Sequence, residues 1–99
     1  MNRGEITFNR EVAPGHFMLT VTVPERFETP QPGQFVMVHL RDRLDVLLGR
    51  PLSVYAFERQ RNGATMQFLY RVIGRGTACL ARLREGDSLD LLGPLGTGF

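Results

Sequence analysis

Residues 71–77, Arg-Val-Ile-Gly-Arg-Gly-Thr, join an apolar strand end to a glycine-flanked turn that opens a short helix. A helix begins with unpaired backbone N–H groups and with the positive end of its dipole. Gly74 and Gly76 carry no Cβ, so a pyrophosphate can approach the main chain closely at this turn. The stretch therefore indicates a binding site for a phosphorylated ligand.

Two arginines flank this turn in the expected fold. Arg50 opens the segment Arg50-Pro51-Leu52-Ser53, and no acidic residue follows it until Glu58. Arg71 leaves its strand just before the glycine turn. Each guanidinium can donate paired hydrogen bonds to phosphate oxygens, so the two are expected to bind a pyrophosphate together. The same residues would also occur if both arginines were solvated at strand ends and the glycine turn simply began a helix. This alternative stays open.

The elements that must position these residues are mostly strands. Short segments with period-two alternation are separated by Pro and Gly, which is typical of an antiparallel sheet. Around Leu80 and Leu83 the period becomes helical, with Thr77 expected to cap the first turn and Gly86 to end the helix. The expected strands cover residues 5–12, 16–23, 35–40, 51–58, 64–73 and 88–92, of which 64–73 is the longest, and the expected helix covers 77–84.

Turn residues punctuate these strands. Pro14-Gly15, Pro32-Gly33 and Asn62-Gly63 are each expected to form tight turns. Residues 41–49 are expected to form a loop, in which the apolar pair Leu47-Leu48 covers the barrel or a bound ligand.

Six short strands have too many edges for one flat sheet, so closure is favoured. The sequence therefore predicts an all-β fold with one short helix, a six-stranded antiparallel Greek-key barrel whose end the helix plugs. The inward face of the second strand should carry Phe17, Leu19, Val21 and Val23. Other residues expected inside the barrel are Met37, Met66 and Phe68.

Composition limits the class of protein. The chain has 99 residues, 42% hydrophobic content and seven Phe, enough for one domain with one core. A net charge of +2 without basic runs does not indicate nucleic-acid binding. Cys79 is the single cysteine, so neither a disulfide framework nor a metal site is expected. No membrane span or signal peptide is apparent, and we expect a cytoplasmic protein with no catalytic residue of its own.

The order of several short motifs resembles a known flavoprotein family. The motifs are Pro32-Gly33-Gln34-Phe35, Arg50-Pro51-Leu52-Ser53, Tyr70-Arg71, Gly74-Arg75-Gly76-Thr77 and the ending Gly-Pro-Leu-Gly-x-Gly-Phe. Together they resemble the flavin-binding barrel of the ferredoxin–NADP reductase superfamily. Within it, the resemblance is to the electron-transfer subunits of dihydroorotate dehydrogenase B, and it spans essentially the whole chain.

The resemblance implies an FAD site. Arg50 would contact the diphosphate, Ser53 would lie near the reactive edge of the isoalloxazine, and Pro51 and Leu52 would line the ring. The strand segment that passes the ribityl and phosphate region would be Leu69, Tyr70 and Arg71, and the helix start on the pyrophosphate would be Gly76 and Thr77.

One position departs from the superfamily pattern. Many members place an aromatic residue directly before the motif serine, where it stacks on the flavin, whereas this chain has Leu52. Polar contacts and phosphate binding should then contribute more to holding the ring. Tyr55 follows Ser53 by two positions and could partly compensate, although such a tyrosine is more often a core or rim residue.

The resemblance also implies what lies outside the chain. Residues 1–93 would be the FAD-binding barrel domain, and 94–99 would begin a linker to a missing nicotinamide-binding domain. NAD and a [2Fe–2S] cluster would belong to that remainder, and the partner would be the catalytic dihydroorotate dehydrogenase subunit in a heterotetramer. The function implied is electron transfer between nicotinamide, flavin and iron–sulfur cluster in pyrimidine biosynthesis.

Two alternatives stay open. The first is the flavin domain of another NAD(P)H- or ferredoxin-linked reductase or of a sulfhydrogenase subunit, which the same motifs would fit. The second is a non-enzymatic small barrel that binds nucleic acid or protein. The sequence disfavours it, because most Phe residues fall on expected inward positions rather than among exposed basic residues.

Overall fold

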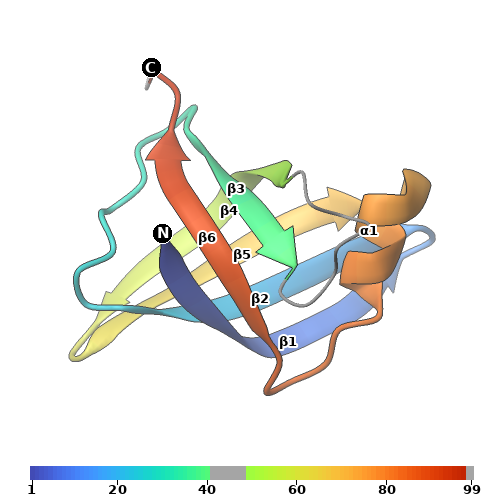
Figure 1. The fold of residues 1–99 in the computed structure, drawn as a ribbon, viewed down its shortest axis with the longest axis horizontal. Helices are drawn as coiled ribbons and strands as arrows, with labels where there is room; N and C mark the ends of the chain where they lie inside the picture. Colours follow the sequence, from blue (N-terminus) through green and yellow to red (C-terminus); the bar gives the residue numbers. More distant parts are fainter. Residues whose placement is uncertain (41–48, 98–99) are drawn as a thin grey trace.

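The structure is a computed structural model that describes residues 1–40 and 49–97. In these residues, six strands form one closed barrel in the order β1-β2-β5-β4-β3-β6. Helix α1 lies at one end of the barrel (Figure 1). The elements are β1 (Asn2–Ala13), β2 (His16–Pro24), β3 (Phe35–Leu40), β4 (Arg50–Gln60), β5 (Gly63–Arg71), α1 (Gly74–Ala81) and β6 (Ser88–Leu95).

The strand order is that of a Greek key. β3, β4 and β5 are consecutive antiparallel neighbours, and β6 returns to pair with the other edge of β3. β1 pairs with both β2 and β6, and β2 pairs with β5, so the sheet closes on itself. The predicted antiparallel six-stranded barrel with one short helix is confirmed.

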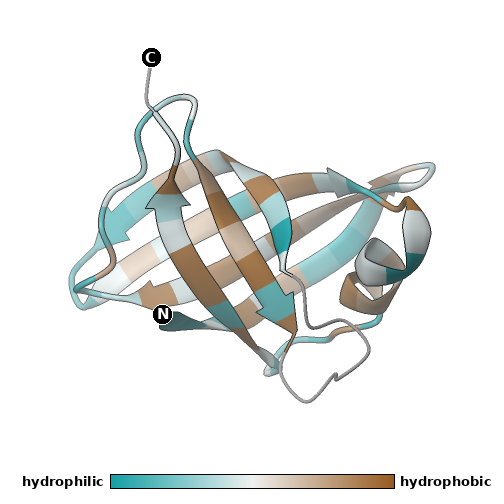
Figure 2. Cartoon of the chain, turned by 45° about the horizontal axis from the view of Figure 1, so that its top comes forward, coloured by the Kyte–Doolittle hydropathy of each residue, from teal (hydrophilic) through white to brown (hydrophobic). Residues whose placement is uncertain are grey.

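Alternation along the strands builds the core. Hydrophobic and hydrophilic bands follow one another along the strands in Figure 2. On β2, Leu19, Val21 and Val23 are buried as predicted, and Phe17 is partly buried against them. Thr20, on the other face, is also buried, so this strand is covered on both sides where it passes Thr20.

The methionine prediction is only partly right. Met66 and Phe68 of β5 are fully buried inside the barrel, as expected. Met37 is only partly buried, whereas both of its neighbours in β3, Val36 and Val38, are fully buried. Because side chains alternate along a strand, Met37 points out of the barrel, and the prediction that it lies inside is wrong.

Two of the predicted turns form where expected. Pro14 and Gly15 connect β1 to β2, and Gly15 has a φ of 74°. Pro32 and Gly33 form a turn closed by a 3.0 Å hydrogen bond from the Gln34 amide to the Gln31 carbonyl. Proline followed by a glycine at φ 90° fits a type II turn.

The β4–β5 turn lies one residue earlier than predicted. Gln60 pairs with Gly63, so Arg61 and Asn62 form the loop and Gly63 begins β5. A Cβ added to Gly63 would lie 2.4 Å from the carbonyl oxygen of Val23. Glycine is therefore required here by the close approach of β2, and the turn itself does not require it.

Helix α1 begins three residues before the predicted start and ends at Ala81 instead of residue 84. Ile73 is its N-cap residue, and Thr77 lies at the end of the first turn. The Ile73 amide donates to Thr77 Oγ1 at 2.8 Å, so Thr77 still satisfies the helix start, but from inside the helix. Gly86 has the left-handed φ of 92° that was predicted, but it does not end the helix. The C-cap residue is Arg82, and Gly86 lies in a later turn that the Asp87 amide closes by donating to the Arg84 carbonyl at 3.0 Å.

Several strand bounds also differ from those expected. β1, with 12 residues, is longer than β5, with nine, so the prediction that the 64–73 strand is the longest is wrong. β6 continues to Leu95 rather than ending at Leu92. The predicted loop over residues 41–49, with Leu47 and Leu48, lies outside the described residues except for Gly49. Among the described residues, no helix is long and apolar enough to cross a membrane.

Candidate functional site

A cavity opens where β4 and β5 separate. The ladder between these two strands begins at Val54 and Phe68. Residues 50–53 pair instead with β3, and residues 69–71 pair with β2. The resulting cavity between β4, β5 and the start of α1 has a volume of about 490 Å³. This volume is within the range of about 300–1,000 Å³ that is usual for small-molecule sites.

The residues that line this cavity include every residue expected to bind the cofactor except Gly76. They are Arg50, Pro51, Leu52, Ser53, Leu69, Tyr70, Arg71, Ile73 and Thr77. Segments about 20 residues apart in the sequence therefore meet at one place, as the shared-site prediction requires.

Arg50 lies directly against α1. A Cβ added to Gly76 would be 2.2 Å from Arg50 Nε and 2.9 Å from Nη2. The buried Gly76 thus leaves the space that the Arg50 guanidinium occupies. The sequence indicated that this glycine lets phosphate approach the backbone, but the structure shows that it lets Arg50 approach.

The start of α1 faces the same cavity. The Thr77 hydroxyl accepts from the Ile73 amide at 2.8 Å and is within 2.8 Å of the Ile73 carbonyl, to which it can donate. By helix geometry, the amides of Gly74 and Gly76 have no acceptor inside the helix, whereas the Thr77 amide reaches back to Ile73. Because the helix starts at Gly74 rather than at Thr77, the amides that are free to bind a phosphate are those of the first turn from Gly74, and the Thr77 amide is not one of them.

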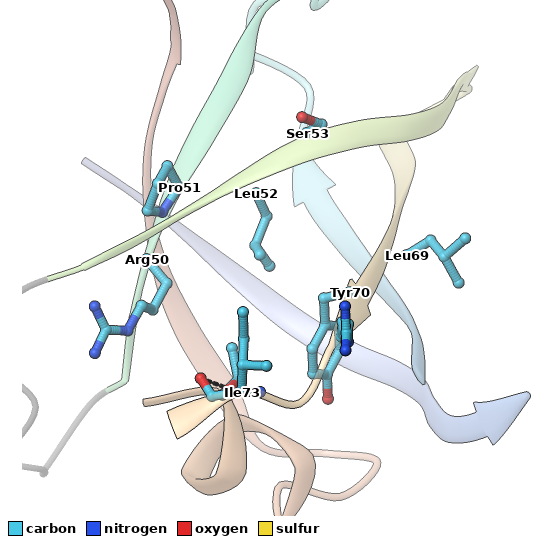
Figure 3. Close-up of a pocket in the computed structure, with 9 residues that line it drawn as sticks. Arg50, Pro51, Leu52, Ser53, Leu69, Tyr70 and Ile73 are labelled. Atoms are coloured by element: carbon cyan, nitrogen blue, oxygen red, sulfur yellow. Dashed lines mark hydrogen bonds between the residues drawn. The ribbon is translucent and has the colours of Figure 1, made fainter. Parts of the chain in front are cut away.

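Part of the cavity wall is apolar. Figure 3 shows Leu52 pointing toward Tyr70 and Ile73, while Ser53 points to the other side of β4. Leu52 is 8% exposed and Tyr70 is 4% exposed, so both form fixed parts of the wall. Leu69 is more exposed and points away from Arg50 (Figure 3). A flat ring could contact this wall while a charged tail reached Arg50, Arg71 and the helix start.

Tyr70 is held by polar and aromatic contacts. Its hydroxyl donates to Asn9 Oδ1 at 2.9 Å, and its ring stacks on Phe17 with centroids 5.7 Å apart. Burial raises the pKa of Tyr70 to about 12, and the Asn9 hydrogen bond partly opposes this shift. The phenol is therefore neutral at physiological pH and can act as a hydrogen-bond donor.

Tyr55 does not join this site. The β4–β5 register shifts between Val54 and Ala56, so Tyr55 is an extra residue in a bulge. It is 62% exposed and lines a second cavity with residues 30–34. The suggestion that Tyr55 compensates for Leu52 is not supported, because Tyr55 does not line the cavity that Leu52 lines.

Sequence reasoning missed Ile73. The residue was assigned to the end of a strand, but β5 ends at Arg71 and Ile73 precedes α1 with its side chain 67% exposed. A helix start placed at Gly74 would have identified Ile73 as the N-cap residue instead of the last residue of a strand.

Comparison with known proteins identifies relatives over nearly the whole chain. The chain is 40% identical over 94 residues to the dihydroorotate dehydrogenase B (NAD(+)) electron transfer subunit of Lysinibacillus sphaericus, covering 95% of this chain and 35% of that protein. The subunit of Bacillus caldolyticus is 40% identical over 98% of this chain and 37% of its own length. The subunit of Enterococcus faecalis is 37% identical over 95% of this chain and 35% of its own length. No family model matches the chain.

A solved structure agrees with this relationship. It is the NADH-dependent reduced ferredoxin-NADP oxidoreductase studied for flavin-based electron bifurcation, and it superposes with a TM-score of 0.77 and 29% identity. The match covers 97% of this chain and 35% of the other. The chain thus spans between 35% and 37% of the length of these relatives. The predicted resemblance is therefore confirmed: with its closed antiparallel barrel, the chain is similar over nearly its whole length to part of the electron-transfer subunits of dihydroorotate dehydrogenase B and to part of a ferredoxin-NADP oxidoreductase.

Proposed function

We propose that this chain binds FAD in the cavity between β4, β5 and α1. The observation that carries the proposal is that Arg50, Arg71 and the start of α1 converge on one cavity with an apolar wall. Guanidinium groups and helix amino ends both bind phosphate oxygens, and the apolar wall suits a flavin ring. The names of the relatives support an oxidoreductase function.

Each part of the chain has a separate role in this proposal. Arg50 and Arg71 bind the diphosphate, and Gly76 and Thr77 place the first turn of α1 beside it. Pro51 and Leu52 line the ring. Ser53 lines the same cavity although its side chain points away from Leu52, so in this proposal the reactive edge of the ring extends past β4 toward Ser53. Leu69 and Tyr70 line the path between ring and diphosphate.

Bound FAD would supply the redox chemistry of the isoalloxazine, and the chain supplies binding and orientation. Leu52 provides aliphatic packing where an aromatic side chain would stack, so the phosphate contacts carry a larger share of the affinity. Tyr70 is neutral and buried, so it adds a rigid wall without placing a charge beside the ring.

We further propose the setting in which this domain acts. Residues 1–93 and the last two residues of β6, which ends at Leu95, form the FAD-binding domain, so the connection predicted over 94–99 begins after Leu95. It would lead to the remainder of the subunit, which would hold a nicotinamide-binding domain and a [2Fe–2S] cluster. The complete subunit would pass electrons between NAD, FAD and the cluster for a catalytic dihydroorotate dehydrogenase subunit in the cytoplasm. The names of the curated relatives support this proposal.

A second candidate is the flavin domain of an NAD(P)H- and ferredoxin-linked reductase. The solved neighbour carries such a name and matches 97% of the chain. The barrel residues would have the same roles in both candidates. Purification of the full-length protein from its own cells separates them, because only the first candidate co-purifies with a dihydroorotate-oxidising subunit.

Fluorescence titration of the purified chain with FAD and with FMN tests the binding proposal. FMN lacks the second phosphate and the adenosine, so FAD should bind at least about tenfold more tightly. Arg50→Gln and Arg71→Gln should each weaken FAD binding about tenfold, whereas Arg61→Gln in the distant β4–β5 turn should not. Failure to bind FAD at about 1 mM would contradict the proposal.

A further inference from the structure

The carboxamide of Asn9 connects the cavity wall to α1. Asn9 Nδ2 donates to the carbonyl of Leu80 at 2.9 Å and to that of Leu83 at 3.0 Å. Asn9 Oδ1 accepts from the Tyr70 hydroxyl at 2.9 Å. One side chain of β1 therefore joins three groups that are more than 60 residues away in the sequence.

These three bonds fix which way the amide faces. The helix carbonyls can only accept, so they require the NH₂ group, and the remaining oxygen must face Tyr70. Tyr70 must then donate, as a neutral phenol can. No other orientation of the amide satisfies all three partners.

The orientation of α1 depends on such contacts. The helix has eight residues, too few to be stable alone, and its buried face consists of Gly76, Thr77 and Leu80. Leu80 is fully buried in the core, and Asn9 binds the carbonyl of that same residue. The C-terminal end of α1 is thus fixed to the barrel by both packing and hydrogen bonds.

Fixing this end controls the other. A helix of this length spans about 12 Å, so a tilt of about 5° at the C-terminal end moves its start by about 1 Å. That start contains Gly76, against which Arg50 packs, and Thr77, which lines the cavity. A shift of about 1 Å is enough to disturb a phosphate-binding geometry.

We propose that Asn9 is a positioning residue for the cofactor site: it holds α1 so that the first turn of the helix meets the diphosphate beside Arg50. Asn9 does not line the cavity, and it acts through α1 and Tyr70. The inference rests on the proposed FAD function and assigns to that site a residue that the sequence motifs do not include.

Asn9→Asp is the informative variant. The carboxylate can still accept from Tyr70, but it has no hydrogen to donate to the two helix carbonyls and repels them. Asn9→Leu is similar in size and uncharged. It removes the same two donors, and also the acceptor for the Tyr70 hydroxyl, and it serves as the second variant if the charge of Asn9→Asp prevents folding. Asn62→Asp, the same change in the exposed β4–β5 turn, is the matched control.

The measurements are FAD and riboflavin affinities by fluorescence, and hydrogen exchange of the α1 amides. Riboflavin has no phosphate, so its affinity reports only on the cavity wall that contacts the ring. Comparing it with FAD therefore separates loss of the contact between α1 and the diphosphate from general damage to that wall. For Asn9→Asp and Asn9→Leu we expect FAD affinity to fall about tenfold, riboflavin affinity to change less than about twofold, and residues 74–81 to exchange faster. Asn62→Asp should match the wild type in all three.

Three results would overturn the inference while leaving FAD binding intact: unchanged FAD affinity, an equal loss for FAD and riboflavin, or unchanged exchange in α1. If the wild-type chain binds no FAD, the proposed function fails and the positioning role fails with it. The wild-type titration therefore distinguishes the two failures.

Discussion

At the scale of single residues, Gly76 shows that a motif glycine can have a physical role other than the one its sequence context indicates. Its missing Cβ makes room for the Arg50 guanidinium, 2.2 Å from where that Cβ would be. The sequence could place a glycine here but could not show which group approaches it, because Arg50 comes from another strand. Ile73 was missed for a related reason, since its exposure depends on where β5 ends.

Gly76→Ala should weaken FAD binding without weakening the fold. The new methyl group meets the flexible end of Arg50, which can move away and lose its phosphate contact, at a cost of about 1.4 kcal/mol or tenfold in affinity. Alanine also favours the helix by about 0.5–1 kcal/mol. FAD titration and urea unfolding measure both effects, and a variant that binds FAD as tightly as the wild type would refute the role of this contact.

Tyr70 should make stability depend on alkaline pH. Its folded pKa of about 12 is above the ordinary value of about 10. Between these values the unfolded chain loses the phenol proton first, so stability is fully present below about pH 10 and falls as pH rises toward about 12. Urea unfolding at several pH values should show this fall in the wild type and in Tyr55→Phe. An equal fall in Tyr70→Phe would contradict it.

At the scale of elements, the sequence predicted the strands better than their junctions. Alternation and turn residues locate strands such as 35–40, which matches β3, because both signals are local. The helix start, the bulge at Tyr55 and the divergence of β4 from β5 depend on which strands pair. Threonine is a residue type that favours the N-cap position, yet Ile73 occupies that position in α1. Thr77 lies inside the helix, where its hydroxyl accepts from the Ile73 amide.

The β4–β5 hairpin offers a test at this scale. Gly63→Ala would place a methyl group 2.4 Å from the backbone oxygen of Val23, which cannot swing aside as a side chain can. We expect a loss of about 2 kcal/mol in the free energy of unfolding. Urea unfolding of Gly63→Ala beside Gly76→Ala compares the same chemical change at two sites, and equal stabilities for the two variants would contradict this explanation.

At the scale of the whole molecule, the Greek-key barrel could be predicted from the alternating strands and their turn residues. The resemblance to flavoprotein barrels could be predicted because several short motifs occur in a fixed order along the chain. The sequence also predicted that Arg50, Arg71 and the glycine turn lie close together, and Arg50, Arg71 and the start of α1 do meet at one cavity. The cavity itself was not, since it arises where β4 pairs with β3 and β5 pairs with β2 instead of with each other. The prediction for Met37 was wrong because alternation along a strand separates its side chains into two faces but does not say which face points into the barrel.

Cofactor binding should stabilise the entire barrel. The proposed site joins β4, β5 and α1, so a ligand that binds only the folded state adds about 2.7 kcal/mol at a concentration of 100 times its Kd. The melting temperature of the chain should therefore rise with FAD, and less with riboflavin. A melting temperature that does not respond to saturating FAD would contradict binding to the folded state.

The most direct test of the proposed site is an NMR titration that follows every backbone amide as FAD is added. The account predicts the largest shifts at Leu52, Ser53, Tyr70, Arg71, Gly74 and Gly76, which lie on three elements around one cavity. The chemical shifts of the amides in the β4–β5 turn, at Arg61 and Asn62, should not change. Shifts confined to that turn or to the second cavity beside Tyr55, or no shifts at all, would contradict the account.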